Sequence, residues 1–273
     1  MDSNSYSVVR YNEESLVVQA NELVRSKQDD LTLLEAKLVR LAVSQVLKAD
    51  TDFRTYSCHV SDLAGFLGIS RDNIYRDVRD LAVSIMKKSI FIKDNQPTKR
   101  GKQNYKIFHW VDYVEYKDGV ITFRLSESLK PYLLGLEEIF TMYSYGALID
   151  LPTTYSIRLY ELLVSWVNAI WVEDKPNYTN VPIESNEIIF SIDYLREYFN
   201  CLNKYPNAGD FVVNVIDVSV KAINEKTFMD VSFRKVKQGR KIGYIVFSFN
   251  NMEDLTPEQE IKWARIKALR ERL

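Results

Sequence analysis

The stretch Phe190–Asn250 decides the fold of this chain. It opens with Phe190-Ser-Ile-Asp-Tyr-Leu-Arg-Glu-Tyr-Phe-Asn200, a short helical pattern in which Ser191 is placed to cap the first turn. A turn is predicted next, over Cys201–Gly209. A short capped helix followed by a turn is the first half of a helix-turn-helix.

A second and longer helix is predicted after this turn, from Phe211 to about Lys226, with Asp210 as its cap. Apolar residues recur along it at helical spacing and indicate one buried face. This predicted stripe comprises Phe211, Val215, Val218 and Ala222.

Two β-rich runs complete the stretch, Met229–Val236 and Lys241–Phe249, joined at Gln238-Gly239. The order of short helix, turn, longer helix and hairpin is that of a winged helix, in which the hairpin is the wing. The wing carries five cations and no acid between them: Arg234, Lys235, Lys237, Arg240 and Lys241. Positive charge beside a recognition helix suits the phosphate backbone of DNA.

The same plan occurs earlier in the chain. Val60–Ile69 predicts another short helix that stops near Gly68, and Ser70 is placed to cap a longer helix from Arg71 to about Lys88. The apolar stripe of this longer helix aligns with the later stripe, and comprises Ile74, Val78, Leu81 and Ile85. Because an internal repeat means that one structural unit is used more than once, the predicted fold class is α+β, with two tandem winged-helix domains.

Length and composition agree with this plan. A chain of 273 residues suggests about two domains, and 46% hydrophobic with 27% charged residues is typical of a soluble globular protein. The formal net charge of −1 argues against unselective coating of nucleic acid, but selective binding depends on local patches. No apolar run approaches the ~20 residues of a membrane-spanning helix, and the start lacks a secretory signal. Cys58 and Cys201 are expected to be free thiols in a reducing cytoplasm.

Four segments are predicted along the chain: a flexible N-terminus over 1–15, a first winged-helix domain over 16–150, a second over 151–250, and a helical tail over 251–273. The boundary between the two domains is placed at Asp150–Thr154. Within the first domain, Thr32-Leu-Leu-Glu35 predicts a capping box and a helix to about Lys48. One strand is expected over Tyr105–Tyr116 and a second over Val120–Leu125.

Several strings now appear in a fixed order along the chain: Asn21–Val24, Leu31–Leu38, Phe123–Leu134, Phe140-Thr141, Tyr155–Leu163, Ala222–Thr227, and Gly239-Arg240 ahead of Ile245–Phe249. The most specific are Ser-Ile-Arg-Leu-Tyr-Glu-Leu-Leu at 156–163 and Leu-Lys-Pro-Tyr-Leu at 129–133. Over residues 16–250 the chain resembles the replication initiators of iteron-containing, theta-replicating plasmids.

The resemblance implies two winged-helix domains that bind tandem repeats (iterons) in double-stranded origin DNA and recruit a host initiator and the replicative helicase. It also implies a monomer that starts replication and a homodimer that represses its own promoter. In this family the second domain reads bases, and the first contacts phosphates or forms the dimer. We expect the dimer interface on an exposed apolar strand, Lys106–Glu115, with Phe108, Val111 and Tyr113.

The chain departs from the family at the start of the second recognition helix, where basic residues are usual. Arginine readout of guanine has no candidate there, whereas the side chains of Asn207 and Asn214 can pair with adenine. An AT-rich repeat is therefore the hypothesis.

DNA contacts are predicted in both domains. In the first domain they comprise Arg71, Asn73, Arg76 and Lys87 on the recognition helix, and Lys99, Arg100 and Lys102 in a basic wing tip over Lys93–Lys106. In the second domain they comprise Lys204, Asn207, Asn214 and Lys221, with Arg234, Lys235, Lys237, Arg240 and Lys241 of the wing. Structural roles are predicted for Arg158, Glu161, Asn224 and Glu225.

Nothing in the sequence indicates catalysis. There is no Gly-x-x-x-x-Gly-Lys and so no P-loop. A nicking initiator needs a His-x-His metal site, but the only histidines, His59 and His109, are far apart. A zinc site needs a ligand cluster, and Cys58-His59 lacks a partner pair. No catalytic residue, cofactor or metal is predicted.

Two other interpretations stay open. A dimeric winged-helix transcriptional repressor without a replication role would share the fold, and the family strings disfavour it. A protein–protein module that uses winged helices only as scaffolds would fit the slightly negative net charge, and the two basic wings disfavour it.

Overall fold

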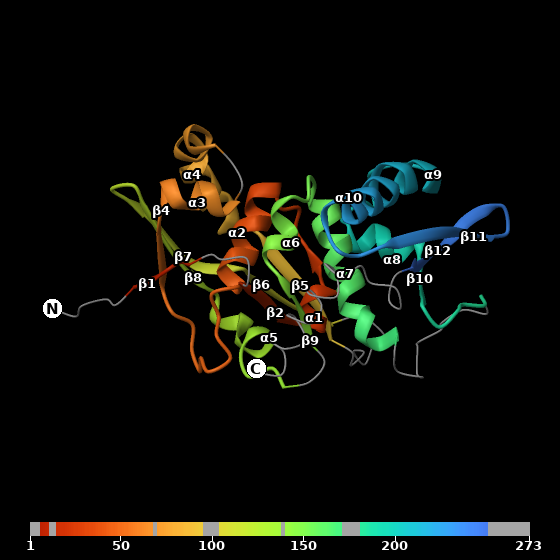
Figure 1. Cartoon of the computed structure of the whole chain (residues 1–273), viewed down its shortest axis with the longest axis horizontal. Helices are drawn as coiled ribbons and strands as arrows, with labels where there is room; N and C mark the ends of the chain where they lie inside the picture. Colours follow the sequence, from red (N-terminus) through yellow and green to blue (C-terminus); the bar gives the residue numbers. More distant parts are fainter. Residues whose placement is uncertain are drawn as a thin grey trace. The chain divides into compact units, whose positions relative to one another are not determined.

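The computed structural model describes residues 6–10, 15–67, 70–94, 104–137, 140–170 and 181–250, without the side chains of 71–73, 76, 94 and 167–170. The chain divides into two compact units, the first unit Met1–Asp150 and the second unit Leu151–Leu273. Figure 1 labels the elements of both. No helix in the described part of the chain is long and apolar enough to cross a membrane.

The described elements of the first unit are, in chain order, β1 (Ser7–Val8), β2 (Leu16–Ala20), α1 (Asn21–Val24), β3 (Lys27–Gln28), α2 (Leu33–Val43), β4 (Tyr56–His59), α3 (Val60–Leu67), α4 (Arg71–Ile85), β5 (Ser89–Asp94), β6 (Asn104–His109), β7 (Val111–Lys117), β8 (Val120–Leu125), the 3-10 turn η1 (Glu127–Leu129), α5 (Lys130–Leu133), β9 (Phe140–Ser144) and α6 (Gly146–Ile149).

The start of α2 follows directly from its sequence. The Glu35 backbone N–H donates to Thr32 Oγ1 at 3.2 Å, and the Thr32 N–H donates to Glu35 Oε2 at 2.7 Å. Two backbone donors at the start of the helix are thereby satisfied, which confirms the predicted capping box. The helix ends at Val43, earlier than the predicted Lys48.

Helices α3 and α4 form the predicted helix-turn-helix of the first unit. All four residues of the predicted stripe on α4 are buried, and they are Ile74, Val78, Leu81 and Ile85. Ser70 occupies the N-cap position of α4, but its side chain makes no capping hydrogen bond, so the predicted side-chain cap is wrong. This stripe was predictable because its spacing keeps one line of apolar residues on one side of the helix.

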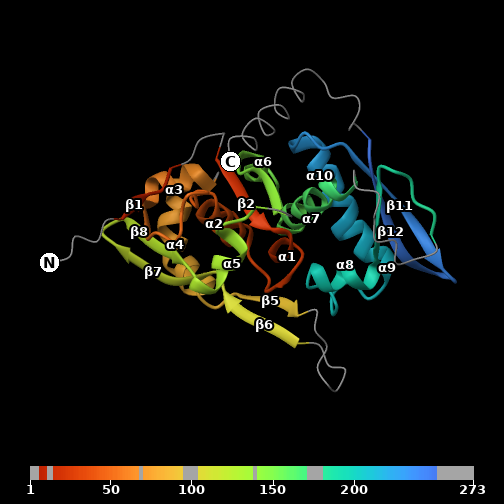
Figure 2. The ribbon, with the colours of Figure 1, turned by 90° about the horizontal axis from the view of Figure 1, so that it is seen from below.

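The single strand predicted over Tyr105–Tyr116 is wrong. Strand β6 pairs with β5 in the sheet β3-β5-β6, whereas β7 pairs with β8 in the sheet β1-β4-β8-β7. Between them Trp110 is fully buried, so the chain turns its largest side chain into the core and passes from one sheet to the next. Figure 2 shows the β5–β6 hairpin separate from β7 and β8.

The described elements of the second unit are α7 (Thr154–Ile170), β10 (Glu187–Ser191), α8 (Ile192–Tyr198), α9 (Ala208–Phe211), the π-helical turn η2 (Val212–Asp217), α10 (Val218–Lys226), β11 (Val231–Gln238) and β12 (Lys241–Phe249). Strand β10, which the sequence did not predict, pairs with β12 and completes an antiparallel sheet of order β10-β12-β11.

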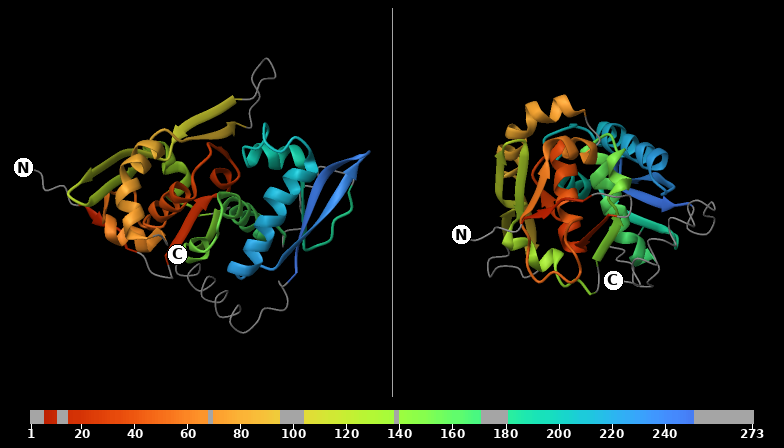
Figure 3. Two further views of the ribbon diagram at one scale, coloured as in Figure 1. Left: turned by 90° about the horizontal axis from the view of Figure 1, so that it is seen from above. Right: turned by 60° about the vertical axis from the view of Figure 1, so that its left-hand side comes forward.

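Helix-turn-helix and wing follow one another in the second unit as predicted. Ser191 caps α8, because its Oγ accepts from the Tyr194 N–H at 3.1 Å. Segments α9, η2 and α10 run on as the recognition helix, Ala208–Lys226. Strands β11 and β12 form the wing, and Figure 3 (left) shows this hairpin in deep blue beside the recognition helix.

Two predictions about the recognition helix are wrong. The cap is Asn207 rather than Asp210, because Asn207 Oδ1 accepts from the Asp210 N–H at 2.8 Å. Val218 is 45% exposed, although Phe211, Val215 and Ala222 are buried. The buried face is broader than the predicted stripe and also includes Val212, Ile216, Val220 and Ile223, with the polar Ser219 buried next to Val218. Strict α-helical spacing placed Val218 on this face, but the π-helical turn η2 just before it shifts the helical register.

The wing turns at Gly239-Arg240, with Gln238 and Lys241 as the last register partners. The turn therefore lies one residue later than the predicted Gln238-Gly239. Gly239 is its first central residue, with φ +64°, a left-handed conformation that favours glycine.

Candidate nucleic-acid interface

Besides Arg234, the wing of the second unit presents four exposed cations: Lys235, Lys237, Arg240 and Lys241. Strands β11 and β12 hold them on one hairpin. They make no ion pair within the described part of the chain. A row of solvated cations on a hairpin beside a recognition helix matches what a phosphate backbone requires.

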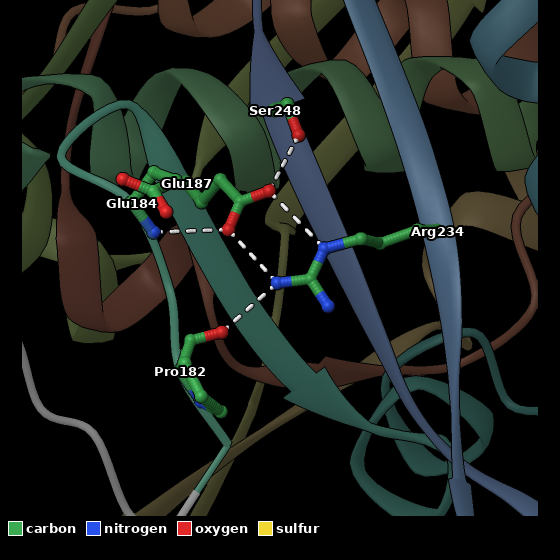
Figure 4. Close-up of polar contacts among 5 residues, drawn as sticks. All are labelled: Pro182, Glu184, Glu187, Arg234 and Ser248. Carbon is green, nitrogen blue, oxygen red and sulfur yellow. Dashed lines mark hydrogen bonds and ion pairs between the residues drawn. The ribbon is translucent and has the colours of Figure 1, made fainter.

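Arg234, the fifth predicted wing cation, is instead part of an ion-pair network (Figure 4). Its Nε donates to Glu187 Oε1 at 3.2 Å, and its Nη2 donates to Glu187 Oε2 at 2.9 Å and to the Pro182 carbonyl at 2.9 Å. Ser248 Oγ donates to Glu187 Oε1 at 3.0 Å. Because Glu187 lies on β10, Ser248 on β12 and Arg234 on β11, the network joins all three strands.

The electrostatics of Glu187 reflect this network. The hydrogen bonds from Arg234, together with those from the Glu184 N–H and Ser248, hold the pKa of Glu187 down at about 2. The same pairing raises the pKa of Arg234. The wing sequence itself contains no acid, and the partner of Arg234 comes from β10, a strand that was not predicted.

The outer face of the recognition helix carries Asn214, Asp217 and Lys221, all of which are exposed. Asn214 Nδ2 donates to the Asp210 carbonyl at 2.8 Å. This bond uses one of the two amide hydrogens of Asn214. Lys221 Nζ lies 4.0 Å from Glu225 Oε1, a weak exposed pair.

Asn207, predicted to contact adenine, caps its own helix instead. Its Oδ1 is the helix cap, and its Nδ2 donates to Asp210 Oδ2 at 2.5 Å. The side-chain amide is thereby engaged at both ends by the first turn of its own helix. The structure therefore leaves Asn214 as the asparagine on the outward face. The predicted Lys204 is exposed in the preceding turn, where its carbonyl accepts from Arg196 Nη2 at 2.9 Å.

Asn224 has the structural role predicted for it. Its Nδ2 donates to the Val231 carbonyl at 2.8 Å, and its Oδ1 accepts from the Val231 N–H at 2.9 Å. This pair of hydrogen bonds joins the end of the recognition helix to the first residue of the wing. Arg158 and Glu161, on α7, are buried, and the Arg158 guanidinium lies 4.0 Å from the centre of the Tyr198 ring.

The first unit shows less of its predicted interface. Lys99, Arg100 and Lys102 lie outside the described residues, as do the side chains of Arg71, Asn73 and Arg76. Lys87 is exposed but lies two residues after the end of α4, not on the helix as predicted. Arg79 is also exposed on α4.

The residues predicted for a dimer interface divide between surface and core. Val111 is 4% exposed and belongs to the core, so its predicted interface role is wrong. Phe108 is half-buried, with its ring stacked on Tyr132 at 5.6 Å. Tyr113 is 38% exposed. The most exposed apolar side chain of this region is Ile107 on β6, at 61%.

The described residues hold no group of three or more His, Cys, Asp or Glu side chains arranged for a metal. In the described structure neither Cys58 nor Cys201 forms a disulfide, and both thiols are buried. Burial raises the pKa of the Cys58 thiol to about 12, so this thiol is not an activated nucleophile.

Comparison with known proteins bears directly on these two units. Residues 16–164 match the family model described as "Initiator Replication protein, WH1", and residues 191–249 match "Initiator Rep protein, WH2". A crystal structure of the Pi initiator protein in complex with iteron DNA has 20% identity and a TM-score of 0.63, and the match covers 89% of this chain and 100% of that one. At this identity the likeness shows a shared fold.

A crystal structure of the WH1 domain of MSBI1.176, a replication protein isolated from a multiple sclerosis patient, has 19% identity. It covers 37% of this chain and 79% of that one, with a TM-score of 0.29, too low to compare the folds. The two family matches confirm the α+β fold of two winged-helix domains and the resemblance found in the sequence. The chain therefore belongs to the family of initiator replication proteins.

Proposed function

We propose that this protein binds tandem repeats in a plasmid origin and thereby starts replication of that plasmid. The observation that carries the proposal is the second unit, where a helix-turn-helix lies beside a wing with four exposed cations. Family membership and the fold shared with an initiator crystallised on iteron DNA support it.

Each part of the second unit has a task in this proposal. The recognition helix Ala208–Lys226 enters the major groove, and the wing follows the backbone, with Lys235 and Arg240 as phosphate contacts. Asn214 pairs with an adenine through its amide, which favours an AT-rich repeat. Selection of binding sites from random DNA tests this last point, and GC-rich selected cores would contradict it.

The protein acts without catalysis of its own in this proposal. Origin melting comes from binding energy, from bending of the DNA and from partner proteins. Those partners are a host initiator and the replicative helicase, and the protein works in the cytoplasm, where plasmid DNA is. A homodimer that represses the protein's own promoter is the second form, and exposed apolar side chains of the first unit such as Ile107 and Tyr113 are its proposed contacts.

Replication in trans tests the proposal. A plasmid that carries only the origin repeats and a marker is introduced into host cells with or without this chain on a second replicon. The proposal expects stable maintenance only when the chain is present, and loss of maintenance with the double variant Lys235→Ala, Arg240→Ala. A chain that binds the repeats and represses a promoter but never supports maintenance is a transcriptional repressor, and the proposal is then wrong.

A further inference from the structure

We propose that Val213 reads the C5 methyl group of a thymine in the major groove. This inference rests on the proposed function, because it assumes that the recognition helix Ala208–Lys226 enters DNA. Val213 would thus join Asn214 in reading bases, although its side chain has no hydrogen-bonding group.

The first observation is where apolar surface is exposed. In the described part of the second unit, the exposed large apolar side chains are Leu202, Val213 and Val218. All three belong to the helix-turn-helix, and Val213 is the more exposed of the two on the recognition helix, at 55% against 45%. Single exposed apolar residues are ordinary, but here none lies outside the one motif that would face DNA.

The second observation is the place of Val213 within the helix. It lies in the second turn, next to Asn214 and inside the π-helical turn η2. Residues near the N-terminus of a recognition helix are the ones that contact base edges. Wide π turns are rare and occur often at functional sites. Val218 lies five residues further along and falls outside this leading part.

The third observation is the charge around Val213. Asp210 and Asp217 lie three residues before and four residues after it, and both are exposed. Lys221, the cation on this face, already has Glu225 at 4.0 Å. Carboxylates are repelled by phosphates, so this face is unsuited to the backbone, which the wing contacts instead. In the major groove the apolar group offered by a base is the thymine methyl, and an aliphatic side chain matches it.

Uracil substitution tests the contact, because deoxyuridine differs from thymidine only by the absence of that methyl group. Affinity of the full chain is measured on duplexes of its own origin repeat, with each thymine in turn replaced by deoxyuridine. We expect one thymine position at which the replacement weakens binding about fourfold, the value of one buried methyl group. With Val213→Ala, the thymine and deoxyuridine duplexes should bind equally well at that position.

Val218→Ala is the matched control, since it makes the same change at an exposed site of the same helix and should keep the wild-type ratio. Alanine is the best helix former, so both variants stay folded. Specific binding to the repeat with no sensitivity to deoxyuridine, or sensitivity that Val213→Ala leaves unchanged, overturns the inference and leaves the proposed function standing. No preference of the wild-type chain for the repeat overturns both.

Discussion

The ion pair with Glu187 distinguishes Arg234 from the other four cations of the wing, which make no ion pair within the described residues. Arg234 uses its guanidinium on a carboxylate and a carbonyl of its own domain. Lys235, Lys237, Arg240 and Lys241 stay exposed. Phosphate contact is thus expected from four cations of the wing rather than from five.

Glu187→Gln tests the role of this pair through its pH dependence. The pKa of Glu187 in the folded chain is about 2, below its ordinary value of 4.5. The ionised group therefore stabilises the folded state fully above about pH 4.5, and this stabilisation is lost as the pH falls toward 2. Glu187 is 8% exposed but Arg234 is 46% exposed, so solvent screens the pair.

At pH 7 the variant should be less stable by on the order of 1–2 kcal/mol. The difference from the wild type should shrink steadily below pH 4.5. Urea denaturation of both proteins at several pH values measures it. A difference that stays constant down to pH 3 would show that the charge of Glu187 contributes nothing.

Some of these side-chain roles followed from the sequence and some did not. Asn224 was predictable, because an asparagine at a helix end commonly satisfies nearby backbone groups. The role of Arg234 was not, since its partner lies 47 residues earlier on a strand that only tertiary pairing reveals. The same holds for Val111, whose burial follows from the break at Trp110.

In the second unit, the side chain of Asn224 forms a joint between the recognition helix and the wing. Asn224 makes two hydrogen bonds to Val231, at 2.8 and 2.9 Å, where the recognition helix ends and β11 begins. This joint fixes where the wing leaves the helix, and hence where its cations lie relative to the outward face of the helix.

Asn224→Ala should destabilise the folded chain by about 1–3 kcal/mol, because it leaves the Val231 N–H and carbonyl without their partner. Asn214→Ala is the control, since Asn214 lies on the same helix and its single bond runs to an exposed carbonyl. It should change stability by less than about 0.5 kcal/mol. Thermal unfolding followed by circular dichroism compares the two, and equal losses would contradict the role of the joint.

Elements with strong local signals were the predictable ones. The α2 capping box, the stripe of α4 and the wing hairpin each follow from residues close together in sequence. The break between β6 and β7 was not predictable, because both strands are β-rich and only their partners differ. Strand β10 was missed because Glu187–Ser191 is short and runs directly into α8.

The chain taken as a whole has two compact units, and the proposed dimer belongs to the first. Its described surface includes exposed apolar side chains on β6 and β7, while the neighbouring Val111 is in the core. Self-association through this surface should therefore respond to Ile107 and not specifically to Val111.

Ile107→Asp should convert a dimer to a monomer without loss of secondary structure, because Ile107 is 61% exposed. Val111→Asp should instead destabilise the fold by several kcal/mol, since it places an unpaired charge in the core. Sedimentation velocity with circular dichroism separates the two effects. A folded dimer that persists with Ile107→Asp would remove β6 from the interface.

The most direct test is fluorescence anisotropy of the full chain on the tandem repeats of its own plasmid and on scrambled DNA, across a range of salt concentrations. We predict much tighter binding to the repeats, with affinity that falls steeply as salt rises. The double variant Lys235→Ala, Arg240→Ala should reduce the slope of log affinity against log salt by about 2, since each lost phosphate contact removes about 0.9. Equal and weak binding to both DNAs would contradict the account, and the search would then turn to a protein partner.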